Sequence, residues 1–253
     1  MTEPRASGPV VAGRRSVVEA LRARTAVDVM IADNAKATQG MREVLNAARE
    51  AGVSVRGVSR GKLDGIAQDH QGVVAHLATA TSRTLTEREL SAFAFPEQAI
   101  VVVLDGITDP QNLGASARSA EGAGAAMLIT RTKRAADATP AAIRASAGAL
   151  LHLQQARVAN IPRAIERLKD AGFFVVGLAG EADRSIYDEP CPSGRVAVVI
   201  GSEGEGISRL VREHCDSLVA IPLLGRVHSL NASASLAAAL FAYVLPSRPR
   251  TSG

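Results

Sequence analysis

The segment VVIGSEGEGISRL, residues Val198–Leu210, decides the fold prediction, because it joins an apolar strand directly to a glycine-rich loop. The loop carries its glycines at Gly201, Gly204 and Gly206. Glycine lets the backbone approach a ligand closely, but Glu203 and Glu205 disfavour a phosphate, which would meet two carboxylates. We therefore expect an uncharged or cationic ligand at this loop, with an ordinary glycine-rich turn as the alternative.

The second half of the chain repeats this pattern of strand and loop. Strands are predicted at Ala99–Leu104, Ala126–Thr130, Phe173–Leu178, Val196–Ile200 and Ser217–Ile221. Helices are predicted at Leu113–Gly124, Pro140–Ala147, Ile161–Ala171 and Ala232–Val244. Apolar strands that alternate with helices are typical of a parallel sheet covered on both faces. Because ligands bind such sheets at the carboxyl ends of the strands, we expect the functional site there.

Two further loops follow predicted strands in this half. In LDGITDPQNLGASARSAEGAGA, residues Leu104–Ala125, we expect Asn112 to cap a helix and Arg118 to project near the carboxyl edge of the sheet. In VAIPLLGRVHSLNASASLAAALFAYV, residues Val219–Val244, polar residues open an apolar helix, where backbone N–H groups are free. The residues at that helix start are Ser229, Leu230, Asn231 and Ser233. Caps and solvated side chains are the alternative to a functional role.

The first half of the chain reads as a smaller α/β unit. Strands are predicted at Val27–Ala32, Val53–Val58 and Gly72–Leu77, and a helix at Gly40–Ala51 that Gly52 ends. A run rich in threonine and serine then interrupts the pattern. We divide the chain into a flexible tail (1–12), a first domain (13–78), a linker (79–97), a second domain (98–246) and a flexible tail (247–253).

Composition bounds the class of protein. The 253 residues are 47% hydrophobic and 21% charged, as in ordinary globular proteins, with a net charge of +4 that mildly favours polyanions as partners. Eight basic residues between Arg131 and Lys169 either follow phosphates or form a solvated face. Two cysteines without metal-ligand spacing argue against zinc and disulfides. Without a signal core or an apolar run of about 18 residues, we expect a cytoplasmic protein with no membrane partner.

The three loop segments together resemble the three motifs of the SpoU (TrmH-like) branch of the SPOUT RNA methyltransferases. The matching residues are Asn112, Gly114 and Arg118; Gly201, Glu203, Gly204 and Gly206; and Ile221, Pro222, Ser229, Leu230, Asn231 and Ser233. Two other stretches, HQGVVA at His70–Ala75 and GEADRSIYD at Gly180–Asp188, resemble the RlmB-like subgroup, which methylates a guanosine ribose of 23S rRNA.

This resemblance implies a trefoil knot in the carboxyl-terminal part of a SPOUT parallel sheet, a preceding ribosomal-protein-like RNA-binding domain and a homodimer. We expect no metal, because His214, Cys215 and His228 lack metal-ligand spacing. It implies S-adenosyl-L-methionine as cofactor, held by Ile200, Gly201, Gly204, Gly206, Ile221, Pro222, Leu223, Ser229 and Leu230. It implies Arg118 as the base or activator of the ribose hydroxyl, with Asn112, Glu203, Ser229 and Asn231 completing the polar site. Arginine normally stays protonated, so phosphate clamping and hydroxyl orientation are the chemically safer roles for Arg118.

The expected function is transfer of a methyl group from S-adenosylmethionine to a ribose 2′-hydroxyl of RNA, with a guanosine of 23S rRNA as the expected target. The alternatives are the same chemistry on tRNA or on another rRNA nucleotide in antibiotic resistance, and a noncatalytic RNA-binding or ribosome-assembly protein. The sequence departs from the subgroup at His228, which we expect to face solvent, and at residues 232–234, where Ala-Ser-Ala replaces a more usual Val-Ser-Val.

Overall fold

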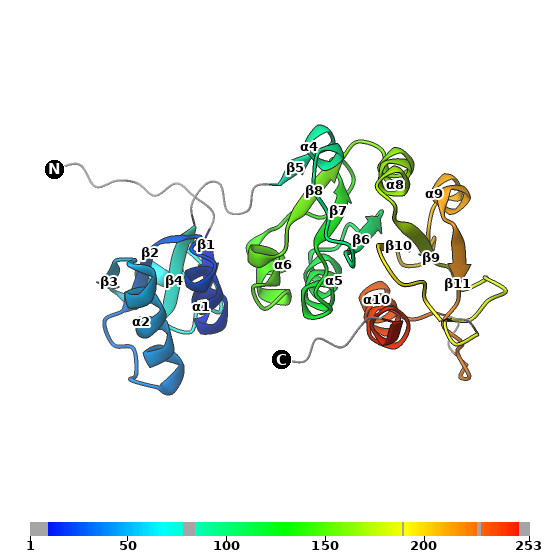
Figure 1. Ribbon diagram of the computed structural model, residues 1–253. Coiled ribbons are helices and arrows are strands. Elements are labelled where there is room, and N and C mark those ends of the chain that lie inside the picture. Colours follow the sequence, from blue (N-terminus) through cyan, green and yellow to red (C-terminus); the bar gives the residue numbers. More distant parts are fainter. Residues whose placement is uncertain (1–9, 78–83, 189, 227–228, 248–253) are drawn as a thin grey trace.

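The computed structural model describes residues 10–77, 84–188, 190–226 and 229–247. The expectation for His228 and those for residues 1–9, 78–83 and 248–253 lie outside the described residues. Two sheets organise the described chain, a four-stranded one near the amino terminus and a seven-stranded one after it (Figure 1).

The first sheet has the strand order β1-β4-β2-β3, with β2 and β3 parallel and the other pairs antiparallel. Its elements are β1 (Val10–Ala12), α1 (Arg14–Arg22), β2 (Ala26–Ala32), α2 (Gln39–Ala51), β3 (Val55–Val58), α3 (Arg60–Asp64) and β4 (Val73–Leu77). Gly52 ends α2 in the left-handed conformation, at φ 69°, as the sequence predicts. The predicted tail 1–12 is wrong at its end, because residues 10–12 are the edge strand β1, which pairs with β4.

The second sheet has the order β11-β9-β10-β6-β7-β8-β5, and every pair in it is parallel. This confirms the predicted parallel α/β sheet. Its strands are β5 (Leu85–Thr86), β6 (Ile100–Asp105), β7 (Met127–Arg131), β8 (Gln155–Val158), β9 (Phe174–Leu178), β10 (Val196–Gly201) and β11 (Ser217–Val219). Its helices are α4 (Glu87–Ser91), α5 (Pro110–Gly122), α6 (Pro140–Ala145), α7 (Ala149–His152), α8 (Ile161–Asp170), α9 (Arg209–His214) and α10 (Ala232–Ala238), which continues as a π-helical turn, Ala239–Val244, and a 3-10 turn, Leu245–Ser247.

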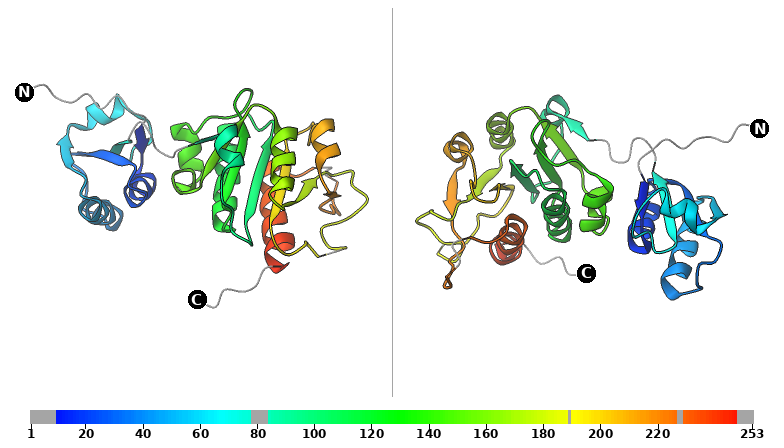
Figure 2. Two further views of the ribbon diagram at one scale, coloured as in Figure 1. Left: turned by 45° about the horizontal axis from the view of Figure 1, so that its top comes forward. Right: turned by 180° about the vertical axis from the view of Figure 1, so that it is seen from behind.

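Helices cover both faces of this sheet (Figures 1 and 2). Side chains of β6 alternate between the two faces, so that Val102 and Leu104 pack in the core under α5 and α10, whereas Val101 and Val103 pack under α8 and α9. Both faces are therefore apolar, which explains why the strands read as continuous hydrophobic runs rather than as alternating ones.

The predicted linker 79–97 is wrong over part of its length. Leu85 and Thr86 pair with β8 as an edge strand of the large sheet. Thr86 also caps α4, accepting from the backbone N–H of Glu89 while the Glu89 carboxylate accepts from the Thr86 N–H. A two-residue strand carries no periodic signal, so this segment, with Thr84 and Thr86, resembles a loop in the sequence.

The two halves of the chain contact each other through α6 and α7. Ile143 and Leu151 join the apolar core built around α1, α2 and the small sheet. Beside them, His152 Nε2 lies 3.0 Å from Glu19 Oε2. A side chain at Gly148 would overlap Glu19, because an added Cβ would lie 2.3 Å from the Glu19 Cβ.

Candidate functional site

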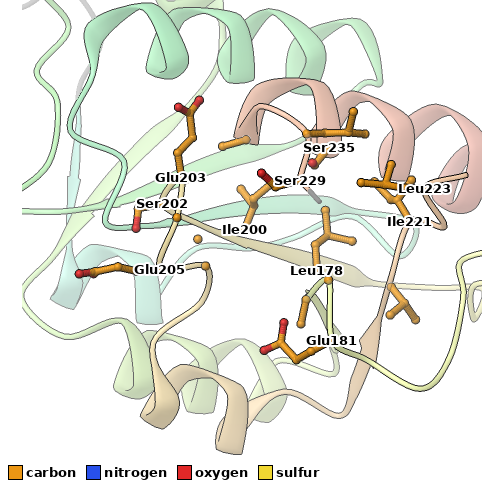
Figure 3. Close-up of a pocket in the computed structure, with 18 of the residues that line it drawn as sticks. Leu178, Glu181, Ile200, Ser202, Glu203, Glu205, Ile221, Leu223, Ser229 and Ser235 are labelled. Carbon is orange, nitrogen blue, oxygen red and sulfur yellow. The ribbon is translucent and has the colours of Figure 1, made fainter. Parts of the chain in front are cut away.

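A cavity of about 610 Å³ opens at the carboxyl ends of β9, β10 and β11 (Figure 3). Three chain segments and the start of α10 form its walls. The lining residues are Leu178–Glu181, Ile200–Gly206, Val219, Ile221, Leu223, Ser229, Leu230, Ala232 and Ser235, together with Arg212. The volume falls in the range of sites for cofactors and small ligands.

Glycine is required where the glycine-rich loop turns back on its own strand. A Cβ built on Gly201 would lie 1.9 Å from the carbonyl carbon and oxygen of Gly206. The return is fixed by a hydrogen bond of 2.9 Å from the Gly206 N–H to the Ser202 carbonyl. Gly204 and Gly206 have φ angles of 86° and 67°, which favour glycine. The loop backbone therefore forms one wall of the cavity.

The loop is anchored from below by Asp105 at the end of β6. Its buried carboxylate accepts a hydrogen bond from the Ser208 N–H at 2.9 Å and another from Arg131 at 2.8 Å. This ion pair, in which the carboxylate is buried and Arg131 is half-buried, ties the ends of β6 and β7 to the chain that leaves the cavity.

Residues from all three sequence motifs meet at Glu203. Asn112 Nδ2 donates to Glu203 Oε1 at 3.0 Å, and Asn231 Nδ2 donates to the same oxygen and to Asn112 Oδ1, the latter at 2.9 Å. Asn231 also caps α10, since its Oδ1 accepts from the backbone N–H groups of Ser233 and Ala234. This polar triad of Asn112, Glu203 and Asn231 joins α5, the glycine loop and α10 beside the cavity.

The cavity combines apolar walls with acidic groups. Figure 3 shows Leu178, Ile200 and Ser229 between Glu203 on one side and Glu181 on the other. Glu181 pairs with Arg212, whose Nε donates to the Ile207 carbonyl at 3.0 Å. Apolar surface, backbone groups and carboxylates suit a ligand with apolar parts and a positive centre, as the sequence predicts for this loop.

The residues predicted to bind a cofactor all line this cavity except Pro222, which is exposed outside it. Those that line it are Ile200, Gly201, Gly204, Gly206, Ile221, Leu223, Ser229 and Leu230. Among the residues predicted to be catalytic, Glu203 and Ser229 line the cavity, and Asn112 and Asn231 reach it through Glu203. Asn112 is not the cap of α5 as predicted, because Asp109 accepts from the N–H groups of Gln111 and Asn112 and Pro110 begins the helix.

Arg118 lies apart from the polar triad. Its side chain is exposed on α5 and forms no hydrogen bond or ion pair with the residues that the structure describes. It stands six residues after Asn112, which is about 9 Å along the helix axis and on a different side. Within one chain, the structure therefore does not bring Arg118 to Glu203.

The basic run from Arg131 to Lys169 is mostly engaged in ion pairs. Glu87 pairs with Arg163 and Arg167, Asp137 with Arg157, and Asp216 with Lys169. Arg131 pairs with Asp105. Lys133, Arg134 and Arg144 make no ion pair within the described part of the chain. Of the eight basic residues in this run, these three are the ones without an ion pair among the described residues, and they remain available to a phosphate.

Sequence reasoning missed Asp105, Glu181 and Arg212. Asp105 ends an apolar strand, and an acidic residue at the carboxyl end of a strand is a signal that marks candidate sites. Glu181 and Arg212 come from segments 31 residues apart, and no local pattern pairs them. Within the described residues, no cluster of His, Cys, Asp and Glu suits a metal ion, and no helix is long and apolar enough to cross a membrane.

Two profiles of known families match the chain. One, described as the SpoU rRNA Methylase family, matches residues 99–243, and the other, described as RNA 2′-O ribose methyltransferase substrate binding, matches residues 10–82.

Individual relatives match over most of their length. A 23S rRNA (guanosine-2′-O-)-methyltransferase RlmB from Vibrio cholerae is 41% identical over 201 residues, 78% of this chain and 80% of the relative. A putative TrmH family tRNA/rRNA methyltransferase YacO from Bacillus subtilis is 37% identical, covering 92% of this chain and 93% of the relative. The structure of the SpoU methyltransferase AviRb from Streptomyces viridochromogenes in complex with the cofactor AdoMet is 26% identical, with a TM-score of 0.73 over 93% of this chain and 88% of that chain.

Proposed function

This chain belongs to the SpoU rRNA methylase family, and from that premise we propose that it transfers a methyl group from S-adenosylmethionine to a ribose 2′-hydroxyl of 23S rRNA, at a guanosine. The observation that carries the proposal is the polar triad, in which Asn112, Glu203 and Asn231 join the three sequence motifs beside one cavity. The names of relatives at about 40% identity support 23S rRNA as the substrate. Because another relative is named a tRNA/rRNA methyltransferase, tRNA is the alternative substrate.

The cavity fits S-adenosylmethionine, which when bound supplies an electrophilic methyl group on a sulfonium centre. Backbone groups of Gly201, Gly204 and Gly206 approach the ligand because these residues have no side chains. Leu178 and Ile200 supply apolar contact, and the carboxylate of Glu203 favours a cation, whereas Glu181 is already paired with Arg212. Pro222 would act from outside the wall, by fixing the chain beside Ile221 and Leu223.

The polar triad has a positioning role in this proposal. Glu203 Oε1 holds the amides of Asn112 and Asn231, so that the first turns of α5 and α10 stay in register with the glycine loop. Ser229 adds a hydroxyl at the cavity wall. These groups orient the ribose for in-line attack, and orientation supplies a large share of the rate in such reactions.

Arg118 has the role of binding the substrate phosphate and orienting the 2′-hydroxyl, with direct proton removal as the alternative. The planar fork of guanidinium donors suits a phosphate, which favours the first role. We expect Arg118→Ala to abolish methyl transfer and to leave cofactor binding nearly unchanged, as measured by turnover and by equilibrium titration with the cofactor. Unchanged turnover in that variant would remove Arg118 from the mechanism.

A homodimer would complete this site. Arg118 and Gly122 are four residues apart and share one face of α5, and a Cβ on Gly122 would touch the ring of Phe241 at 3.6 Å. Phe241 is 50% exposed, so an apolar ring lies bare on the same side of the helix as Arg118. We propose that a second copy covers this face and that Arg118 acts across the boundary, which analytical ultracentrifugation tests together with the Phe241→Asp variant.

The remaining proposals concern the rest of the fold. The amino-terminal unit, residues 13–78, is proposed to bind the RNA substrate, which the match to a substrate-binding family supports. A trefoil knot is proposed for the carboxyl-terminal part of the domain 98–246. In its support, the segment after β11 bonds to the loop after β9, through Ala220 N–H to the Arg184 carbonyl at 2.7 Å, and α10 then packs on α5. The proposed location is the cytoplasm, where rRNA is modified.

The direct test is transfer of labelled methyl from S-adenosylmethionine to unmodified 23S rRNA and to tRNA, with the product mapped by its resistance to alkaline cleavage. Label at one alkali-resistant guanosine of 23S rRNA is the expected result. Label in tRNA alone would move the substrate to the alternative class. Cofactor binding without transfer to either RNA would contradict the proposed substrates, and absence of cofactor binding would favour a noncatalytic RNA-binding protein.

A further inference from the structure

A second, smaller cavity of about 230 Å³ lies at the carboxyl ends of β7 and β8. Its walls include Leu113, Thr130, Asp137, Gln155 and Arg157. The volume corresponds to roughly eight water molecules. It is thus much smaller than the cofactor cavity, and a single flat ring system is the size of ligand that it suits.

The polar groups of this cavity retain unused hydrogen-bonding capacity. Thr130 is 9% exposed, and its hydroxyl bonds to none of the residues that the structure describes. Arg157 donates from Nη2 alone, to the Ala136 carbonyl at 3.1 Å and to Asp137 Oδ1 at 2.5 Å. Its Nε and Nη1 donors find no acceptor among the described residues, and Asp137 Oδ2 makes no bond there either. These groups are accessible from the cavity, since the side chains of Arg157 and Asp137 are 33% and 70% exposed, and so they can bond to a ligand that enters it.

The small cavity lies next to the polar triad. Leu113, which lines it, directly follows Asn112, which donates to Glu203 in the wall of the larger cavity. The loop that carries Asp137 is held to the loop before α5 by a hydrogen bond from the Ala136 N–H to the Ile107 carbonyl at 2.9 Å. The two cavities therefore flank the first turn of α5, and a ribose held at Asn112 places its base within reach of the smaller one.

Guanine matches these groups better than any other base. Its Watson–Crick edge carries two adjacent donors, N1–H and N2–H, beside the acceptor O6. A carboxylate accepts from two adjacent donors, and a guanidinium donates to an oxygen beside them. Adenine would instead turn the lone pair of N1 towards the carboxylate.

We propose that this second cavity binds the guanine base of the RNA substrate, with Asp137 accepting from N1–H and N2–H, Arg157 donating to O6, and Thr130 bonding to a remaining ring or exocyclic atom. The inference rests on the proposed function, because it takes the reacting ribose to lie at the polar triad. It makes Asp137 and Arg157 the residues that select guanosine at the methylated position.

The first experiment compares guanosine with inosine, which lacks the N2 amino group, at the methylated position of the RNA that accepts the methyl group. We expect wild-type kcat/KM to fall about 10- to 150-fold with inosine, the effect of one hydrogen bond to a charged group. Asp137→Ala should methylate both RNAs at similar, reduced rates. Asp170→Ala removes an exposed aspartate at the end of α8 and should behave as wild type. Equal wild-type rates on both RNAs, or full discrimination retained by Asp137→Ala, would overturn the proposal.

The second experiment measures base binding without transfer. Guanosine 5′-monophosphate and adenosine 5′-monophosphate are titrated into the cofactor-saturated protein, and backbone amide shifts are followed by NMR. We expect shifts around Thr130, Asp137 and Arg157 with the guanosine nucleotide only, and their loss in Asp137→Ala. Such shifts in a protein that methylates no RNA would retain the cavity assignment and reject the proposed function. The opposite outcome is also distinguishable. If the protein methylates RNA, Asp137→Ala still prefers guanosine to inosine, and the guanosine nucleotide causes no such shifts, then the proposed function stands and the cavity assignment is rejected.

Discussion

Replacing Gly201 by alanine should disrupt the larger cavity through a clash of backbone with side chain. The new Cβ would lie 1.9 Å from the Gly206 carbonyl carbon and oxygen and 2.2 Å from the Ile207 nitrogen. Because all three are backbone atoms, no side-chain rotation relieves the overlap, and the loop must move by about 1 Å or more. Overpacking of this kind costs about 1–3 kcal/mol. Loss of the bond between Gly206 and Ser202 adds about 1 kcal/mol, so we expect the free energy of unfolding to fall by about 2–4 kcal/mol.

Two measurements check this prediction. Urea unfolding gives the change in stability, and equilibrium titration with S-adenosylmethionine should show an affinity at least about tenfold lower, since the displaced loop lines the proposed cofactor site. Gly180→Ala is the matched control, because Gly180 lines the same cavity but an added Cβ there meets nothing within 4 Å. The control should stay within about 0.5 kcal/mol of wild type. Wild-type stability and wild-type cofactor affinity in Gly201→Ala would contradict the close approach of loop and strand.

Three further predictions concern single side chains. Asn231→Ala should lower the free energy of unfolding by about 1 kcal/mol and also reduce methyl transfer. Asn231→Ser should restore the helix cap and the stability but not methyl transfer, because serine cannot bridge to Glu203. Unfolding and turnover assays separate the two effects. A hydrogen bond from Arg56 holds the pKa of Asp28 below its ordinary value of 3.8, so this pair stabilises the fold above pH 3.8 and the stabilisation is lost as the pH falls through the lowered pKa. Arg56→Gln should therefore be less stable than wild type by about 0.5–1 kcal/mol at pH 7, with a difference that shrinks below pH 3.8, as urea unfolding across pH will show. Burial raises the pKa of the Cys215 thiol to about 12. At pH 8 this thiol should therefore react with a chromogenic disulfide at least about 100-fold more slowly in the folded protein than in the unfolded protein. Equal reaction rates would contradict the burial.

The fold of the second half follows from sequence because its strands are buried on both faces. Runs such as Ile100–Leu104 are apolar at every position, and glycine or polar residues mark where they end. Strands without this property are missed. Gln155–Val158 alternates polar and apolar residues over four positions, too few for a periodic signal, and Leu85–Thr86 is shorter still. Only pairing within the sheet makes these segments strands.

In the candidate site, likewise, the sequence identifies individual residues but not the contacts between segments that are far apart in the chain. Asn112, Glu203 and Asn231 stand out in sequence because each lies in a polar segment after an apolar strand. Their mutual contact depends on the order of strands in the sheet, which places β6 beside β10. Sequence cannot supply the pairing of Asp137 with Arg157, or the lack of a partner for the Thr130 hydroxyl among the described residues. Both depend on how the loop after β7 packs against β8. The small cavity is accordingly a structural finding without a sequence signal.

The position of Arg118 connects the chemistry to assembly. A reaction at the polar triad needs a cation near the substrate phosphate, yet Arg118 points to another side of α5, where Phe241 leaves an apolar ring exposed beside Gly122. Within one chain, the two cavities and the polar triad thus adjoin the first turn of α5, whereas Arg118 is exposed on another side of this helix. If a second copy packs over that face, each arginine enters the environment of the other chain, and burial beside an apolar surface would strengthen its pull on a phosphate. Methyl transfer would then require the dimer for chemistry as well as for stability, which separates this arrangement from one in which each chain carries a complete site.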